Sequence, residues 1–151
     1  MIKQILVPLD NSDLSIRVLD VAFSVAGKFD ADVRLLRINK ERASLERGQS
    51  ELDMRIVEQE ADALLGAAVG RLRGEHGLAA ENVQVEVRSG PVFQTIADAA
   101  NEHQSDLVIM GTHGRHGFTE MFTGSTTEQI VARIPTSVMV IKPEGFPYLR
   151  D

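Results

Sequence analysis

Short apolar runs alternate with longer segments of helical periodicity along the whole chain. The runs predict strands at Ile2–Leu9, Asp32–Ile38, Val83–Arg88, Leu107–Met110 and Val138–Ile141. Apolar residues at helical spacing predict helices at Leu14–Gly27, Leu52–Leu72, Val92–Ala100 and Thr126–Arg133. Strict alternation of strands and helices is typical of βαβ units and a parallel sheet. The chain is too short for a (β/α)₈ barrel, so we expect an open, doubly wound α/β sheet with helices on both faces.

Local patterns refine this expectation. The first strand is continuously apolar from Ile5 to Leu9, as in a strand buried on both faces, and Ser12 can cap the helix that follows. Val83, Val85 and Val87 alternate with polar residues, which indicates a strand with one wet face or an edge strand. In the strand order 3-2-1-4-5, that strand lies at one edge and Val138–Ile141 at the other.

Length and composition predict one globular domain. The 151 residues include 43% hydrophobic and 25% charged residues, which is ordinary for a soluble domain. The whole span 1–151 therefore reads as a single domain, with a loose tail at 143–151. The charged segment Asn39–Glu51 reads as an exposed connection, to which we assign no function.

Composition also excludes several classes of function. The chain has no cysteine, which excludes thiol catalysis, disulfides and cysteine-ligated metals. The net charge of −6, one Tyr and no Trp argue against general binding of nucleic acid. No apolar stretch approaches the roughly 20 residues of a membrane span, and no signal peptide is apparent. We therefore expect a cytoplasmic protein that acts on neither membranes nor nucleic acid.

The segment after the fourth strand is rich in glycine and hydroxyl side chains. Ligands of open α/β sheets bind beyond the carboxyl ends of the strands, where the strand order reverses, so the loops after strands one and four matter most. Gly124 and Ser125 open the last helix, whose free N–H groups favour phosphate, and Arg115 adds a positive charge. The alternative is that the glycines only shape a loop and Ser125 only caps the helix.

The spacing of this segment is specific. Gly111, Gly114, Gly124 and Ser125 form G-x₂-G-x₉-G-[S/T], and with Ile-Leu-Val-Pro-Leu-Asp at the start and Gly90-Pro91 before the third helix the chain resembles the ATP-binding branch of the universal stress protein family. The resemblance covers nearly the whole chain. It implies a Rossmann-like fold of the adenine nucleotide alpha hydrolase type, ATP as ligand, with or without Mg²⁺, and a regulatory role in stress responses.

The resemblance assigns the adenosine to the ends of the first two strands. Asp10 matches the family's acidic residue near the adenosine, and the neighbouring Pro8 and Leu9 match its base pocket. Ile38, which ends the second strand, matches its apolar adenine contact. A carboxylate suits ribose hydroxyls and would repel a triphosphate. The alternative for Asp10 is an Asx-turn that merely starts the helix.

The resemblance assigns the phosphates to the glycine-rich segment. Met110 and Gly111 match the contacts that follow the fourth strand, and His113 of the same turn is also counted among the ligand-binding residues. The residues that match the phosphate cradle are Gly114, Arg115, Gly124, Ser125 and Thr126. Glycines and a helix start suit phosphate oxygens on physical grounds as well.

The histidines do not predict a metal centre. His113 and His116 have H-x-x-H spacing, but no third ligand is evident, so we interpret His113 as part of the Gly-Thr-His-Gly turn and His116 as exposed. His76 and His103 lie among polar residues and are expected to be solvated. The chain also lacks the P-loop, dinucleotide and nucleophile-elbow motifs.

Three functions remain open at this point. The first is an ATP-binding regulatory protein with little or slow hydrolysis. The second is an enzyme that hydrolyses ATP or transfers its phosphoryl group, and the third is a partner-binding module with a vestigial pocket. The last strand carries no charge or proline to protect its edge, and the family resemblance implies dimers joined through it. We therefore expect a homodimer with antiparallel contact at Ser137–Lys142.

Overall fold

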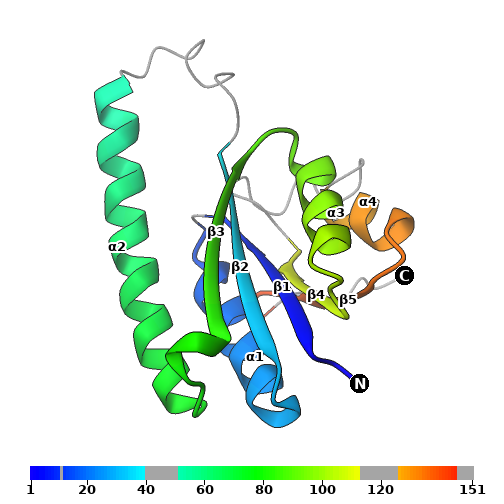
Figure 1. The fold of residues 1–151 in the computed structure, drawn as a ribbon. Helices are drawn as coiled ribbons and strands as arrows, with labels where there is room; N and C mark the ends of the chain where they lie inside the picture. Colours follow the sequence, from blue (N-terminus) through cyan, green and yellow to red (C-terminus); the bar gives the residue numbers. More distant parts are fainter. Residues whose placement is uncertain (11, 40–50, 113–125, 146–151) are drawn as a thin grey trace.

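Five parallel strands form one sheet in the order β3-β2-β1-β4-β5, as the sequence predicts (Figure 1). The structure is a computed structural model that describes residues 1–10, 12–39, 51–112 and 126–145. The strands are β1 (Gln4–Leu9), β2 (Asp32–Asn39), β3 (Val83–Ser89), β4 (Leu107–Gly111) and β5 (Ser137–Ile141). The helices are α1 (Leu14–Phe29), α2 (Glu51–Glu75), α3 (Val92–Glu102) and α4 (Thr126–Arg133), with a short 3₁₀ turn at Ala80–Asn82.

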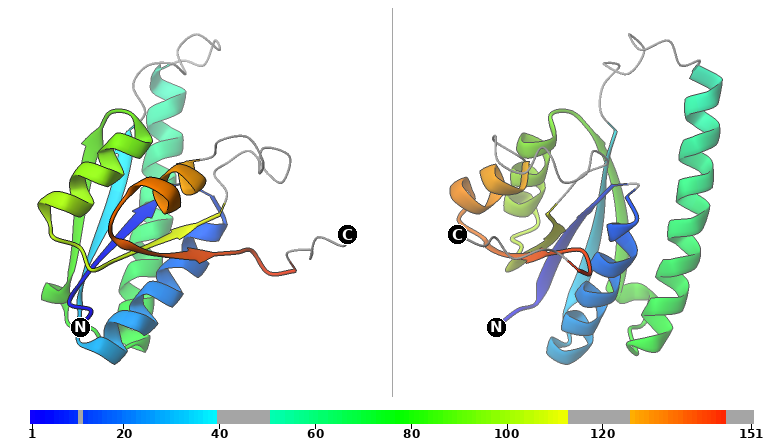
Figure 2. Two further views of the ribbon diagram at one scale, coloured as in Figure 1. Left: turned by 90° about the vertical axis from the view of Figure 1, so that its right-hand side faces the viewer. Right: turned by 180° about the vertical axis from the view of Figure 1, so that it is seen from behind.

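The helices cover both faces of the sheet. The helices α1 and α2 lie on one face, and α3 and α4 lie on the other (Figure 2). The chain moves outward from β1 to β3 and then returns to β4 on the other side of β1. The strand order therefore reverses between β1 and β4, where a doubly wound sheet opens a crevice at its carboxyl edge.

The strand β1 is the centre of the core because its two faces join two apolar clusters. Val7 belongs to the cluster under α1 and α2, together with Leu19 and Phe23 of α1. Leu6 points the other way and packs with Ile96 of α3 in the second cluster. Burial on both faces explains why this strand is apolar at every position from Ile5 to Leu9.

The edge strand β3 does not present its faces as the alternation suggests. Val85 and Val87 are 68% and 57% exposed, whereas Glu86 and Arg88 on the opposite face are half-buried. Hydrogen bonds to Glu102, the last residue of α3, and to His103, the residue after it, hold these two side chains inward. Of the three valines only Val83 packs against the core. The strand is an edge strand as predicted, but its apolar face is the wetter one.

The two helices over the first face meet closely at one end. The helix α2 packs through the half-buried Leu65 and Val69 and the buried Ala68 and Leu72, while the predicted core positions Leu52, Ile56 and Leu64 have side chains outside the described set. An added Cβ at Gly27 of α1 would lie 2.8 Å from the carbonyl oxygen of His76. No helix in the described part of the chain is long and apolar enough to cross a membrane.

Candidate functional site

The residues expected at the ligand lie along one edge of the sheet wherever the structure describes them. Because all strands are parallel, the ends of β1, β2 and β4 and the start of α4 meet at the carboxyl edge. The described residues placed there are Pro8, Leu9, Asp10, Ile38, Met110, Gly111 and Thr126. His113, Gly114, Arg115, Gly124 and Ser125 lie outside the described residues, as does His116.

The apolar members of this group belong to the two cores as much as to the edge. Leu9 is 9% exposed within the cluster under α1 and α2, and Met110 is 6% exposed within the cluster under α3 and α4. Ile38 and Pro8 are half-buried, and Ile38 packs against the second cluster. Pro8 and Ile38 therefore have the surface left to touch a ligand at this edge.

Asp10 is held by the residues that start α1. Its carboxylate oxygen Oδ1 accepts hydrogen bonds from the backbone N–H of Ser12 at 2.9 Å and from the Ser12 hydroxyl. Ser15 donates its hydroxyl to the Asp10 carbonyl at 2.6 Å and approaches Oδ1 at 3.2 Å. The Asx-turn considered as an alternative is therefore present, and it orients an exposed carboxylate at the edge.

The start of α1 differs from the expected cap. The helix begins at Leu14, and the capping position is Asp13, which makes no side-chain capping hydrogen bond. The hydroxyl of Ser12 is directed to Asp10, while its carbonyl accepts the N–H of Ser15 at 3.0 Å. The expectation that Ser12 caps the helix is wrong, because its hydroxyl bonds back to the Asp10 carboxylate and the capping position is Asp13.

Gly111 ends β4 and is packed tightly from one side. A Cβ at this position would lie 2.7 Å from Cδ2 of Leu14, the first residue of α1. Its φ is not in the left-handed region. Close approach of α1 therefore explains this glycine without reference to a ligand, whereas the sequence argument assigned it to ligand contact.

Two threonines beside Gly111 were not predicted as site residues. The hydroxyl of Thr127, in the first turn of α4, donates to the Gly111 carbonyl at 3.0 Å. The N–H of Thr112 extends the β4–β5 pairing by donating to the Ile141 carbonyl, also at 3.0 Å. The Thr112 hydroxyl oxygen is buried and has no hydrogen-bond partner in the described structure. Hydroxyl residues on either side of a glycine-rich segment are the sequence signal that could have identified them.

Comparison with known proteins decides the family. Residues 1–142 match the model of the universal stress protein family. The chain belongs to the universal stress protein family. It is 27% identical over 143 residues to a universal stress protein of Methanocaldococcus jannaschii, which covers 93% of this chain and 82% of the relative.

Solved universal stress proteins share the fold. One, in complex with cAMP, has a TM-score of 0.67 and 20% identity, covering 93% of this chain and 96% of its own. Another, from Archaeoglobus fulgidus in complex with dAMP, has a TM-score of 0.65 and 21% identity, covering 94% of this chain and all of its own. These likenesses place the sheet and its helices in a universal stress protein arrangement.

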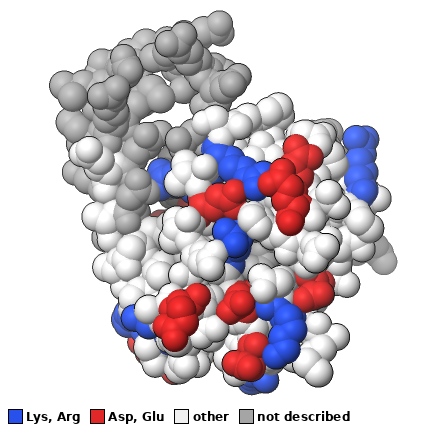
Figure 3. Space-filling model, viewed as in Figure 1, with Lys and Arg blue, Asp and Glu red and all other residues white. Residues whose placement is uncertain are grey.

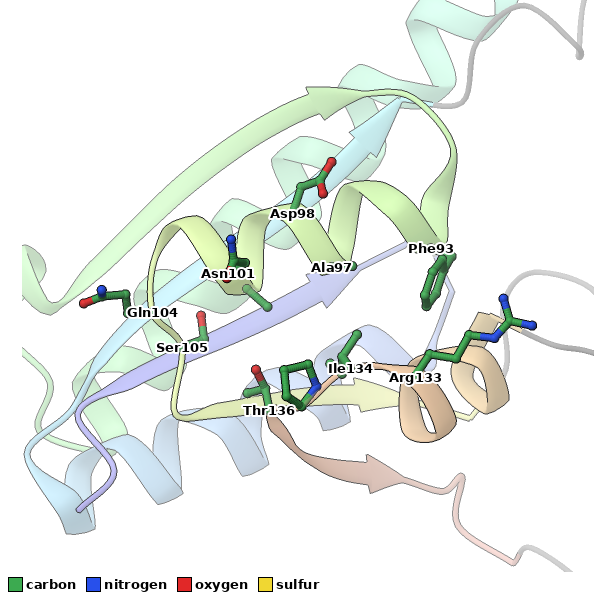
Figure 4. A pocket seen from close by; sticks show the side chains of 11 residues that line it. Phe93, Ala97, Asp98, Asn101, Gln104, Ser105, Arg133, Ile134 and Thr136 are labelled. Atoms are coloured by element: carbon green, nitrogen blue, oxygen red, sulfur yellow. The ribbon is translucent and has the colours of Figure 1, made fainter.

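A groove of about 440 Å³ lies elsewhere on this universal stress protein, between α3 and the connection from α4 to β5 (Figure 4). Phe93 and Arg133 lie toward one end, where the guanidinium is 5.9 Å from the centre of the ring. Ser105 and Thr136 lie toward the other end. Of the residues predicted at the carboxyl edge, none that the structure describes lines this groove.

Among the described residues on the face shown in Figure 3, positive and negative side chains are mixed and form no single basic patch. Glu86 accepts hydrogen bonds from Arg88 at 2.6 Å and His103 at 2.8 Å, and Arg88 also reaches Glu102 at 2.6 Å. Partial burial acts to raise the pKa of Glu86, but the hydrogen bonds to Arg88 and His103 and the electrostatic attraction of these partners together outweigh it and hold that pKa below its usual value.

Each of the two described histidines forms a hydrogen bond to a carboxylate and is only partly exposed to solvent. His103 is half-buried in the network with Glu86, and His76 lies 2.7 Å from the Asp20 carboxylate of α1. The expectation that both are solvated is therefore wrong, because each folds back onto a carboxylate of a neighbouring element. Among the described residues, no group of three or more His, Asp or Glu could hold a metal ion.

Proposed function

We propose that the protein binds an adenine nucleotide at the carboxyl edge of the sheet and uses it as a regulatory ligand. The nucleotide that we propose is ATP. The observation that carries this proposal is the position of the G-x₂-G-x₉-G-S segment. In the sequence this segment begins at Gly111, the last residue of β4, and leads into Thr126, the first residue of α4. That position adjoins the reversal between β1 and β4, where ligands of this fold class bind.

The described side chains suit both the adenosine and the phosphate part of such a ligand. The Asp10 carboxylate is exposed and oriented, which suits the hydroxyls of a ribose. Pro8 and Ile38 offer partly exposed apolar surface to a base. The buried Thr112 hydroxyl, which has no partner among described residues, is a polar atom that a bound group can satisfy. The solved relatives with cAMP and dAMP support an adenine nucleotide in particular.

The phosphates would lie on the glycine-rich side. Gly114, Gly124 and Ser125 would bring backbone N–H groups to the phosphate oxygens, with Thr126 at the start of α4 and Arg115 adding charge. Magnesium would enter with ATP, since no described cluster of acids could hold it alone.

We propose that hydrolysis is slow or absent. Fast phosphoryl transfer needs a residue that activates or positions the attacking water. At the described part of this edge the only carboxylate among the proposed ligand residues is Asp10, which already accepts hydrogen bonds from Ser12 and Ser15. A nucleotide that is held without turnover suits a regulatory protein whose shape or partners depend on occupancy.

The direct test is to identify what the protein carries and what it binds. Mass spectrometry of nucleotide released by denaturing freshly purified protein should detect ATP or its products, and calorimetric titration of stripped protein should give binding for ATP but not for GTP. Product analysis over hours should find little ADP. Absence of both released nucleotide and heat of binding would contradict the proposal, and rapid turnover would make the protein an ATPase.

A further inference from the structure

The hydroxyl of Thr127 joins the two ends of the glycine-rich segment. It donates to the carbonyl oxygen of Gly111 at 3.0 Å, across 16 positions of sequence. Gly111 is the last residue of β4, and Thr127 is the second residue of α4. The bond therefore ties the strand that leads into the segment to the helix that leads out of it.

Gly111 is itself held from the opposite side. The side chain of Leu14 packs so closely on it that a Cβ would approach within 2.7 Å of Cδ2. The N–H of the next residue, Thr112, pairs with the Ile141 carbonyl of β5 at 3.0 Å. The carbonyl oxygen of Gly111, which accepts the Thr127 hydroxyl, therefore belongs to a backbone segment that contacts both α1 and β5. The hydrogen bond attaches α4 to this segment.

We infer that Thr127 is a positioning residue, whose hydrogen bond sets where the first turn of α4 stands relative to the end of β4 and so where bound phosphates are held. The inference rests on the nucleotide binding proposed above. The first N–H groups of a helix have no partners within the helix, and they can serve a phosphate only if the helix start is correctly placed.

This role predicts a loss that depends on the phosphates of the ligand. The adenosine would lie at the ends of β1 and β2, near Asp10 and Ile38, which do not depend on the Thr127 bond. Triphosphate would lie beside α4. Removing the Thr127 hydroxyl should therefore weaken ATP binding and leave adenosine binding nearly unchanged, whereas general damage to the fold would weaken both.

The test compares Thr127→Val with Thr127→Ser and with a matched control. Thr95 of α3 also donates its hydroxyl to a backbone carbonyl at a helix start, that of Pro91 at 2.7 Å, and it lies outside the proposed nucleotide site. Thr95→Val therefore removes a hydroxyl-to-carbonyl bond that is local to the start of another helix. Calorimetric titration with adenosine, AMP and Mg-ATP gives the affinities, and thermal unfolding without ligand gives the stability of each variant.

We expect Thr127→Val to bind ATP about tenfold more weakly and AMP less affected, with adenosine within roughly twofold of the parent. Thr127→Ser should bind ATP like the parent because it keeps the hydroxyl, and Thr95→Val should bind all three like the parent. The inference would be overturned if Thr127→Val bound ATP like the parent, if it lost ATP and adenosine affinity equally, or if Thr127→Ser bound ATP as weakly as Thr127→Val. In each of these cases nucleotide binding by the parent would still support the proposed function. A parent that binds none of the three ligands would overturn both.

Discussion

The Asp106 carboxylate joins the starts of two neighbouring strands at the amino edge of the sheet, opposite the proposed site. Its Oδ2 accepts the backbone N–H groups of Lys3 at 2.8 Å and Gln4 at 2.9 Å, so the start of β4 holds the start of β1. The hydrogen bonds from Lys3 and then Gln4 lower the pKa of Asp106 below its ordinary value. Charge on this side chain is thereby linked to folding.

We predict that Asp106→Asn lowers stability at neutral pH and that the difference shrinks in acid. A group whose pKa is lowered in the folded state stabilises the fold above its unfolded pKa, about 4, and loses that contribution as pH falls through the lower folded value. Urea unfolding of both chains between pH 7 and pH 3 measures the difference. A gap that stays constant across this range would show that the ionised carboxylate is not the cause.

A second residue-scale prediction concerns Gly111. The substitution Gly111→Ala places Cβ against the terminal methyl Cδ2 of Leu14, and turning that half-buried side chain away should cost roughly 0.5–1.5 kcal/mol of unfolding free energy. Leu14→Ala in the same chain should remove part of that penalty, because the opposing side chain is gone. A double-mutant cycle measures the coupling, and strictly additive losses would mean that the two residues do not press on one another.

At the scale of elements, two glycines in neighbouring helices should respond in opposite directions. A Cβ at Gly27 of α1 would meet the backbone oxygen of His76, which cannot rotate away, whereas a Cβ at Gly70 of α2 would meet nothing within 4 Å. Gly27→Ala should cost about 1–3 kcal/mol, and Gly70→Ala should gain about 0.5–1 kcal/mol from helix propensity. Urea unfolding measures both, and stabilisation by Gly27→Ala would contradict the close contact of α1 with the end of α2.

Most elements could be predicted because apolar periodicity reports burial directly. The residues of α4, Thr126–Arg133, are those that the pattern predicts, and the apolar run of β1 corresponds to a strand buried on both faces. The strand order also follows, since alternation of strands and helices leaves few topologies.

The remaining features depend on partners that are distant in sequence. The alternation predicts that the valines of β3 form its buried face. Instead Glu86 and Arg88 point inward, where they contact Glu102 and His103 at the end of α3. The close packing of Gly111 on α1 likewise needs a contact across the sheet. Long-range pairs of this kind leave no periodic signal along the chain.

The candidate site was predictable only in part for the same reason. Motif spacing identified both ends of the glycine-rich segment, and the structure places those ends at the carboxyl edge beside Asp10. Spacing did not identify Thr127, whose role depends on a hydrogen bond to Gly111 16 positions earlier.

At the scale of the whole molecule, the edge strand β5 leads us to propose a homodimer through Ser137–Lys142. Met139 is 36% exposed on this strand, and an unpaired apolar edge invites pairing with a second copy. Met139→Asp should shift the protein to monomers, because an unpaired carboxylate would be buried in the interface, while Met139→Leu should remain dimeric. Light scattering at micromolar concentration measures the mass. A monomeric parent, or a dimeric Met139→Asp, would count against this interface.

The central claim is that the glycine-rich segment binds ATP, and thermal unfolding with and without Mg-ATP tests it most directly. In the parent, ATP at 100 times its dissociation constant should raise stability by about 2.7 kcal/mol. Gly114→Val with Gly124→Val should abolish that increment and leave unfolding without ATP nearly unchanged, because in the sequence both positions fall between the end of β4 and the start of α4. Equal stabilisation of parent and double variant by ATP would contradict the claim.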